Sequence, residues 1–370
     1  MPKHTEPSKP TPRKRIKLES GEKVYVGVDV HRKTYAVALF SESRGLIKHW
    51  SQPAKNRDLV THLDRIKEHV QRVVYEAGPT GFGLVRSLRE AGYKADVIVT
   101  SQVLRTSSNS TKSDRLDCGK LAEHACKDLL KSVYVPSEKQ EQDRQLVRLR
   151  ERMARKQRLA RQQIKSFLLN HNIEQPAGLS SWSEKGFEEL ASLDMNPTLR
   201  YCFGILIEDE KHARGQIGKL NGEIKKLIRE KRHRKKIECL RSVPGVGVLT
   251  AITFVTELID AERFDDAGEV ARSLGLAPRV YQSGDRRREG SMMKDGNERV
   301  RAILVEAAWR WVAVDERGRQ CYARLLKNTG DAKKAIGGAA RKLAIIMWRL
   351  STRLETYRPL EAEVPEAAAA

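Results

Sequence analysis

The sequence predicts a mixed α/β domain, followed by a long helical arm and a helical C-terminal domain. Three observations support this order. Residues 24–30 alternate as a β-strand does, apolar residues between 146 and 227 recur at helical spacing in two long runs, and a Pro-Gly-Val-Gly turn opens the last part. A length of 370 residues is typical of two or three domains. We expect a disordered basic arm at 1–22, the α/β domain at 23–136, the helical arm at 137–236, the C-terminal domain at 237–358 and a flexible tail at 359–370.

The composition points to a polyanionic partner. The chain has 70 Lys and Arg residues against 48 Asp and Glu residues, a formal net charge of +22. Such an excess favours nucleic acid as the partner, although a charge-rich soluble protein without one is the alternative. The sequence has no apolar run of bilayer length, no visible signal peptide, and five scattered cysteines without a CxxC pair. We therefore expect a cytoplasmic protein with reduced thiols, no membrane partner and no zinc finger.

Short strands and helices alternate in the first domain. Val24–Val30 reads as a strand, Thr34–Phe40 as its hairpin partner, and Val73–Glu76 and Ala95–Val99 as two further strands. A Gly-Pro-Thr-Gly turn after the third strand leads into a helix that runs through residue 89. Ser113 can cap a second helix that runs to residue 125.

Four carboxylates form the candidate metal site. Asp29 lies inside the first strand on the face opposite the valines, and Glu76 ends a later strand. Asp114 and Asp117 are three residues apart, so both project from one face of their helix. Converging carboxylates repel one another unless a hard cation lies between them, and Mg²⁺ suits phosphodiester chemistry. The alternative for each is a polar residue at a strand end, or an acid favoured by the helix dipole.

Two long amphipathic runs predict the helical arm. Both have apolar residues three to four apart, which is typical of coiled-coil helices, and Pro176 and Gly178 mark a turn between them. We expect an antiparallel hairpin that either mediates dimerisation or only separates the two ends of the chain. The first helix is rich in cations with few acids, which favours phosphate contact over a merely solvated face. Its basic residues are Arg144, Arg148, Arg150, Arg152, Arg155, Lys156, Arg158, Arg161 and Lys165.

The C-terminal domain carries two candidate nucleic-acid elements. Pro244-Gly245-Val246-Gly247 before a helix resembles a helix-hairpin-helix, in which Gly245 and Gly247 let backbone N–H groups approach a phosphate. A plain helix-helix turn is the alternative. Further on, a long loop from Arg279 to Gly296 contains Ser283, which is either a turn residue or a nucleophile. Three consecutive arginines follow in this loop and could hold a phosphate, namely Arg286, Arg287 and Arg288.

Taken together, four stretches carry a resemblance to a known family. They are 26–33 (VGVDVHRK), 75–78 (YEAG), 112–117 (KSDRLD) and the block 243–297, which contains PGVG, LGLAP, SG and KDGN. In this order and spacing they resemble the DEDD-type transposases of bacterial insertion sequences, the IS110 family, also called bridge recombinases. The resemblance covers nearly the whole chain except its two ends.

The resemblance implies a RuvC-like, RNase H-like first domain whose DEDD set corresponds to Asp29, Glu76, Asp114 and Asp117. It also implies a transposase domain with a catalytic serine, which corresponds best to Ser283. The family often has a second serine before Lys-x-Gly-Asn, but Met293 stands there, so Ser291 is a distant second candidate and Lys294 remains a predicted nucleic-acid contact.

The family's partners follow from the same resemblance. They are donor and target DNA, a structured guide RNA from the element itself, and further copies of the chain, since the acidic site and the serine can meet across protomers. Strand transfer would pass through a phosphoserine.

Three other functions compete with this interpretation. A metal-dependent Holliday-junction endonuclease would use the same carboxylates with water as the nucleophile. A sugar-kinase or actin-like ATPase would need a Gly-rich phosphate loop where His31-Arg32-Lys33 stand. A non-catalytic nucleic-acid-binding protein would leave the four acids without a role.

Overall fold

The structure is a computed structural model that describes residues 16–99, 114–283, 286–293 and 295–360. The side chains of residues 114–116, 280–289 and 291 also lie outside the described set. The chain forms two compact units, which we call the sheet unit (residues 1–135) and the helical unit (residues 136–370). Each is described by itself.

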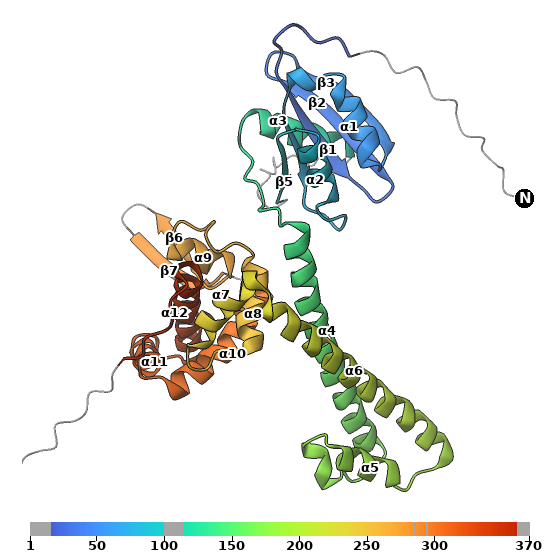
Figure 1. Cartoon of the computed structure of the whole chain (residues 1–370), viewed down its shortest axis with the longest axis vertical. Coiled ribbons are helices and arrows are strands. Elements are labelled where there is room, and N and C mark those ends of the chain that lie inside the picture. Colours follow the sequence, from blue (N-terminus) through green and yellow to red (C-terminus); the bar gives the residue numbers. More distant parts are fainter. Residues whose placement is uncertain (1–15, 100–113, 284–285, 294, 361–370) are drawn as a thin grey trace, which may run out of the picture. The chain divides into compact units, whose positions relative to one another are not determined.

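A five-stranded mixed sheet forms the centre of the first unit, in the order β3-β2-β1-β4-β5 (Figure 1). Strands β1 to β3 form an antiparallel meander, and β4 and β5 run parallel to β1. The four expected strands are present, and the structure adds β3, which the sequence pattern did not reveal. The strands are β1 (Val24–Val30), β2 (Thr34–Ser41), β3 (Gly45–Pro53), β4 (Val70–Glu76) and β5 (Ala95–Ile98).

Helices cover both faces of the sheet. Helices α1 (Asn56–Asp64) and α2 (Gly83–Glu90) pack on the face that carries the fully buried valines of β1, because an alternating strand presents every second residue to one side. Helix α3 (Asp114–Cys126) packs on the other face, against the alanines of β2 and against β4 and β5. A short 3₁₀ turn, η1 (Lys67–His69), precedes β4. Ser113, the expected cap of α3, lies outside the described residues.

Part of the expected N-terminal arm contacts this unit. Ile16 and Leu18 pack against the valine-rich core, and Glu22 accepts hydrogen bonds from the Arg44 guanidinium at 2.8 Å. Residues 1–15 lie outside the described residues.

The second unit begins with two long helices, α4 (Glu138–Asn170) and α6 (Pro197–Arg229), of 33 residues each. They are antiparallel: Arg150 of α4 donates to Asn221 of α6, whereas Arg161, further along α4, donates to Glu210, earlier in α6. A Ser137 capping box begins α4, and the Asn196 side chain caps α6. Where α4 ends and α6 begins, η3 (Ala177–Ser180) and α5 (Glu184–Ser192) pack against both helices and form a small apolar core with them.

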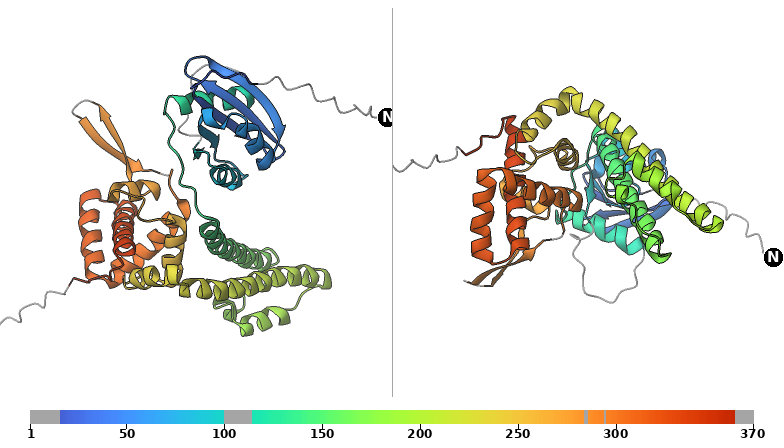
Figure 2. Two further views of the ribbon diagram at one scale, coloured as in Figure 1. Left: turned by 45° about the horizontal axis from the view of Figure 1, so that its top comes forward. Right: turned by 90° about the horizontal axis from the view of Figure 1, so that it is seen from below.

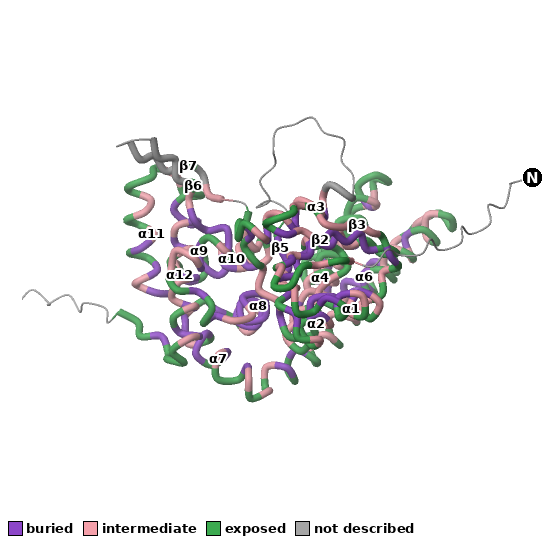
Figure 3. Tube along the Cα trace, turned by 90° about the horizontal axis from the view of Figure 1, so that it is seen from above, coloured by how far each residue is buried: buried purple, intermediate pink, exposed green. Residues whose placement is uncertain are grey.

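Six helices and a hairpin complete this unit. Helix α8 is buried at eight consecutive positions, residues 251–258 (Figure 3), and belongs to the same apolar core as α10 and α12. The helices are α7 (Lys231–Arg241), α8 (Val248–Leu258), α9 (Ala267–Ser273), α10 (Glu298–Val314), α11 (Glu316–Thr329) and α12 (Ala332–Arg353).

The segment expected as a long loop, Arg279 to Gly296, is instead mostly a two-stranded β-hairpin, and this expectation is wrong. Strand β6 (Pro278–Ser283) pairs with β7 (Arg286–Met292), and the hairpin projects from the helices (Figure 2). The Arg, Gly and Ser content suggested a loop, but an antiparallel ribbon satisfies its backbone hydrogen bonds internally whatever the polarity of its side chains.

No helix among the described residues combines the length and the apolar character that a membrane crossing requires.

Candidate active site

Asp29 and Glu76 lie side by side on one face of the sheet. Strands β1 and β4 are parallel with Val28 opposite Tyr75, so the next residues on each strand, Asp29 and Glu76, are neighbours. Adjacent strands lie about 4.8 Å apart. Because side chains alternate, Asp29 projects to the same face as Gly27, and Glu76 to the same face as Val74, and both of these residues contact α3.

Small residues let α3 approach this face closely. A Cβ on Gly27 would lie 2.1 Å from the Cys118 carbonyl oxygen and 2.6 Å from the Ala122 nitrogen. Ala36 and Ala38 of β2 pack against the same two residues of α3. Only glycine fits β1 at this point, and the close contact holds the first turns of α3 next to the strand ends.

Asp117 precedes Cys118 on this helix, and Asp114 is its first residue. The pKa of the Cys118 thiol depends on the carboxylates around it. Burial, together with the negative charges of Asp29 and Asp117, raises its pKa to about 11. The two carboxylates therefore act on one place. Asp114 lies one helical turn before Asp117, but its side chain is outside the described set.

His31 is a residue of this site for which the sequence pattern predicted only a place in a turn. Its Nε2 lies 3.1 Å from the Asp29 Oδ2, and its side chain is half exposed. The spacing Asp29-Val30-His31 could have predicted this contact, because residues two apart at a strand end project to the same face.

The donor set fits a hard divalent cation, because carboxylate oxygens are its preferred ligands. The described side chains include no group of three or more Asp, Glu, His or Cys residues that could by itself hold a metal. Asp29, Glu76 and Asp117 are among those side chains and do not form such a group by themselves, and the side chain of Asp114, the fourth member of the predicted set, is not described.

Ser283 is the last residue of β6 and pairs with Arg286 of β7 in the hairpin register. The hairpin is fixed at its base by two glycines. Gly275 has a φ of +64°, and a Cβ on Gly296 would lie 2.0 Å from the Gly275 nitrogen. The LGLAP and KDGN stretches therefore cross in direct backbone contact and hold the ends of the hairpin together. The side chains of Ser283, Ser291 and the three arginines are not described, and Lys294 lies outside the described residues.

The Pro-Gly-Val-Gly segment joins α7 to α8. Gly245 has a φ of +85°, and a Cβ there would lie 2.7 Å from the Trp311 nitrogen, so it is required for packing. Gly247 is the N-cap of α8 and faces open space. The backbone of this turn is thus accessible at Gly247 but closely packed at Gly245.

Several arginines of α4 are bound inside the protein. Arg148 forms a bidentate ion pair with the buried Glu257, at 2.6 and 2.7 Å. Arg161 donates a hydrogen bond to the fully buried Glu210 at 2.8 Å. Burial lowers the pKa of Arg144, and Arg148 lowers it further. Arg155 pairs with Glu151 on the same helix. By contrast, Arg158 is exposed and has no ion pair among the described residues.

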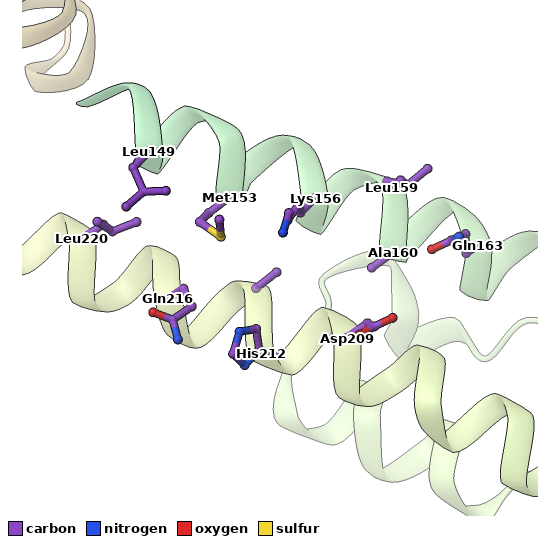
Figure 4. A pocket seen from close by; sticks show the side chains of 11 residues that line it. Leu149, Met153, Lys156, Leu159, Ala160, Gln163, Asp209, His212, Gln216 and Leu220 are labelled. Atoms are coloured by element: carbon purple, nitrogen blue, oxygen red, sulfur yellow. The ribbon is translucent and has the colours of Figure 1, made fainter. Parts of the chain in front are cut away.

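An open groove runs between α4 and α6 (Figure 4). Its volume is about 400 Å³, and leucines, a methionine and alanines contribute much of its lining. Lys156 lines it from α4, and Asp209 and His212 line it from α6. Two helices alone leave this apolar face uncovered.

The chain matches two family models. Residues 26–173 match a transposase model of the DEDD IS110 type, and residues 237–323 match the transposase IS116/IS110/IS902 family. Together the models cover most of the sheet unit, α4 and the hairpin.

Curated relatives agree with these matches. A putative transposase y4qE of Sinorhizobium fredii is 31% identical over 91% of this chain and 82% of its own length. The transposase for insertion sequence element IS1111A of Coxiella burnetii is 24% identical, with 90% of this chain and 91% of the relative covered. The transposase for insertion sequence element IS1533 of Leptospira borgpetersenii is 26% identical, with 78% and 85% covered.

Proposed function

Because this chain belongs to the IS116/IS110/IS902 family of insertion-sequence transposases, we propose that it cuts and rejoins DNA strands through a metal-assisted phosphoserine intermediate. The observation that carries this proposal is the placement of Asp29 and Glu76 on adjacent parallel strands, on the face covered by the helix of Asp117. Strand ends of α/β sheets are common places for active sites.

DEDD-type transposase domains generally depend on a divalent metal. We assign Mg²⁺ to Asp29, Glu76, Asp114 and Asp117, since all four offer oxygen ligands. Bound there, the ion would polarise the scissile phosphate and offset the charge that develops on it. The chain's own contribution is to hold the carboxylates together, which the Gly27 contact with α3 supports.

Ser283 is the proposed nucleophile. Its Oγ forms a bond to phosphorus as the bond from phosphorus to the 3′ oxygen breaks, and the 3′ oxygen takes up the proton that the serine releases. The phosphodiester is conserved as a phosphoserine, so a 3′ hydroxyl can reverse the step on another strand without an external energy source. The Gly275–Gly296 contact supports this role by fixing the base of the hairpin.

Basic residues around the hairpin and along α4 are the proposed DNA contacts. Arg286, Arg287, Arg288 and Lys294 would hold phosphates near Ser283, and the Gly247 backbone would approach another. On α4, the exposed Arg158 is the better candidate, and Arg155 can exchange Glu151 for a phosphate. Arg148 and Arg161 serve chiefly the packing of the helices, since both hold buried carboxylates, whereas the partly buried Arg144 stays a proposed DNA contact.

The remaining partners are a structured guide RNA and further copies of the chain. The surplus of basic residues supports the RNA. The uncovered groove between α4 and α6 supports an oligomer, because one Lys and one Asp in its lining make it self-complementary in charge (Figure 4). RNA that co-purifies from cells expressing the whole element should be a single structured species. Random cellular RNA, with full recombination after RNase treatment, would exclude a guide.

The central test is a trapping experiment on nicked DNA. The parent protein should give a protein–DNA adduct that survives denaturing electrophoresis and maps to Ser283. Ser283→Ala should lose both the adduct and recombination, whereas Ser291→Ala, in the partner strand of the same hairpin, should retain both. Recombination at the parental rate in Ser283→Ala would replace the serine mechanism by attack of water, as in a junction endonuclease.

A further inference from the structure

Four arginines surround an open depression at the C-terminal end of the helical unit. The depression has a volume of about 380 Å³, and Arg317, Arg349, Arg353 and Arg358 line it. Glu355 is the one acidic residue in its lining. The depression therefore carries a net charge of about +3, from four arginines and one glutamate.

The tertiary fold brings these arginines together from three segments. Arg349 and Arg353 are four residues apart on α12, Arg317 is in the first turn of α11, and Arg358 follows α12. Leu354 ends α12 in the left-handed region, at a φ of +55°, which turns the chain back alongside the helix.

Helix dipoles do not account for the cluster. A cation near the C-terminus of α12 is favoured by the dipole, which suffices for Arg353. Arg317 is at the opposite, N-terminal end of α11, where the dipole disfavours a cation. Like charges four apart on α12 also repel each other. An anion in the depression would relieve both costs.

The arginines are available for such an anion. Arg349, Arg353 and Arg358 are exposed, and none has an ion pair within the part of the chain that the structure describes. Arg317 lies over the Tyr357 ring, 5.4 Å from its centroid. Tyr357 is itself fixed, since its hydroxyl donates to Asp315 at 2.8 Å and its backbone N–H donates to the Ser242 Oγ at 2.7 Å. One wall of the depression is thus preorganised.

The depression lies far from the proposed reaction. A Cβ on Gly337, near the start of α12, would touch Met292 at the end of β7. The start of α12 therefore lies next to the base of the hairpin. From Gly337 to Arg349 and Arg353 the helix advances roughly 18–24 Å, at 1.5 Å per residue. At about 3.4 Å per nucleotide, this span from the base of the hairpin, at the end opposite to Ser283, corresponds to roughly five to seven nucleotides.

We propose that this depression binds a backbone phosphate of nucleic acid several nucleotides away from the strand that reacts at the hairpin. The proposal rests on the function proposed above, because it takes nucleic acid as the partner. Guanidinium groups suit phosphate oxygens, with which they form paired, charge-assisted hydrogen bonds. The contact would set the register of the nucleic acid without reading its sequence.

The test measures how affinity for nucleic acid depends on salt, using the full-length protein. Fluorescence anisotropy with a duplex DNA and, separately, with a structured RNA should give a steep slope for the parent. The double variant Arg349→Gln and Arg353→Gln should reduce that slope by about one, as expected when one phosphate is no longer neutralised by the protein. The matched control is Lys225→Gln with Arg229→Gln, an exposed pair of cations at the same spacing near the end of α6, which should leave the slope unchanged.

The two probes identify the source of the phosphate. A reduced slope with DNA alone assigns the depression to DNA, and one with RNA alone assigns it to the guide. An unchanged slope with both, or an equal reduction in the control pair, overturns the proposal. A flat slope in the parent protein refutes nucleic acid as the partner, and with it the proposed function. If the double variant misfolds by circular dichroism, Arg358→Gln, which lies beyond α12, replaces it in the same comparison.

Discussion

The two units use carboxylates in contrasting ways. In the helical unit, Asp143, Glu210 and Glu257 are buried, and each receives an arginine from a distant part of the chain. In the sheet unit, Asp117 is only half-buried and has no ion pair among the described residues, and Asp29 is close to a histidine.

The contrast separates structural acids from candidate ligands. A buried carboxylate is tolerated when a guanidinium satisfies both of its oxygens, as Arg148 does for Glu257. Neighbouring carboxylates at strand ends, such as Asp29 and Glu76, repel one another instead, and a bound cation would offset that repulsion. The predictions below test this division.

The largest expected effect is on catalysis. Asp117→Asn removes one charge from the sheet-unit cluster, and Mg²⁺-dependent DNA cleavage should fall on the order of 10³-fold. Stability should change little, because the side chain is partly exposed. Glu123→Gln, later on the same helix, is the matched control and should cleave like the parent. Parental cleavage by Asp117→Asn in Mg²⁺ would remove this residue from the ligand set.

The second largest effect is expected on stability, when the contact that holds α3 against β1 is disturbed. Gly27→Ala places a methyl group 2.1 Å from the Cys118 carbonyl oxygen, and it should lower the free energy of unfolding by about 3 kcal/mol and also reduce cleavage. Urea denaturation measures the first effect. Gly222→Ala, on α6 with open space around it, should have the opposite sign and stabilise by up to about 1 kcal/mol. Equal urea midpoints for Gly27→Ala and the parent would contradict the close approach of α3.

A smaller effect is expected in the helical unit. Arg148→Ala leaves Glu257 buried without its cation, and the free energy of unfolding should fall by about 2 kcal/mol, less than for a fully buried pair because Arg148 is partly exposed. Arg152→Ala, exposed on the same helix, should change it by less than about 0.5 kcal/mol. If both variants lose equal stability, the ion pair has no special role.

The smallest effect is on the pH dependence of stability. Burial alone would raise the pKa of Glu257, but hydrogen bonds from Arg148 and Asn297 outweigh it and hold the pKa below its ordinary value of 4.5. A depressed pKa contributes stability above the unfolded-state pKa, and this is lost as the pH falls through the folded-state value. The parent should therefore lose more stability below about pH 4.5 than Glu257→Gln does. Urea titrations at several pH values compare the two, and parallel curves would contradict the assignment.

Much of the fold could be predicted because its signals are local. Alternation in β1 places Asp29 opposite the buried valines, as expected, and the two apolar runs correspond to α4 and α6. The hairpin of β6 and β7 was missed, since an arginine-rich strand stabilised by its partner lacks an apolar alternation of its own.

The sequence by itself determined four strands of the sheet, the two long helices, the acidic residues at strand ends and the family, since periodicity and motif spacing depend on residues near one another in the chain. Only the tertiary structure decided which basic side chains remain available to bind an anion. Arg148 and Glu257 are 109 residues apart, and the basic depression combines arginines from three segments. A charged side chain is bound or available according to what packs against it, and that depends on how distant elements meet in space.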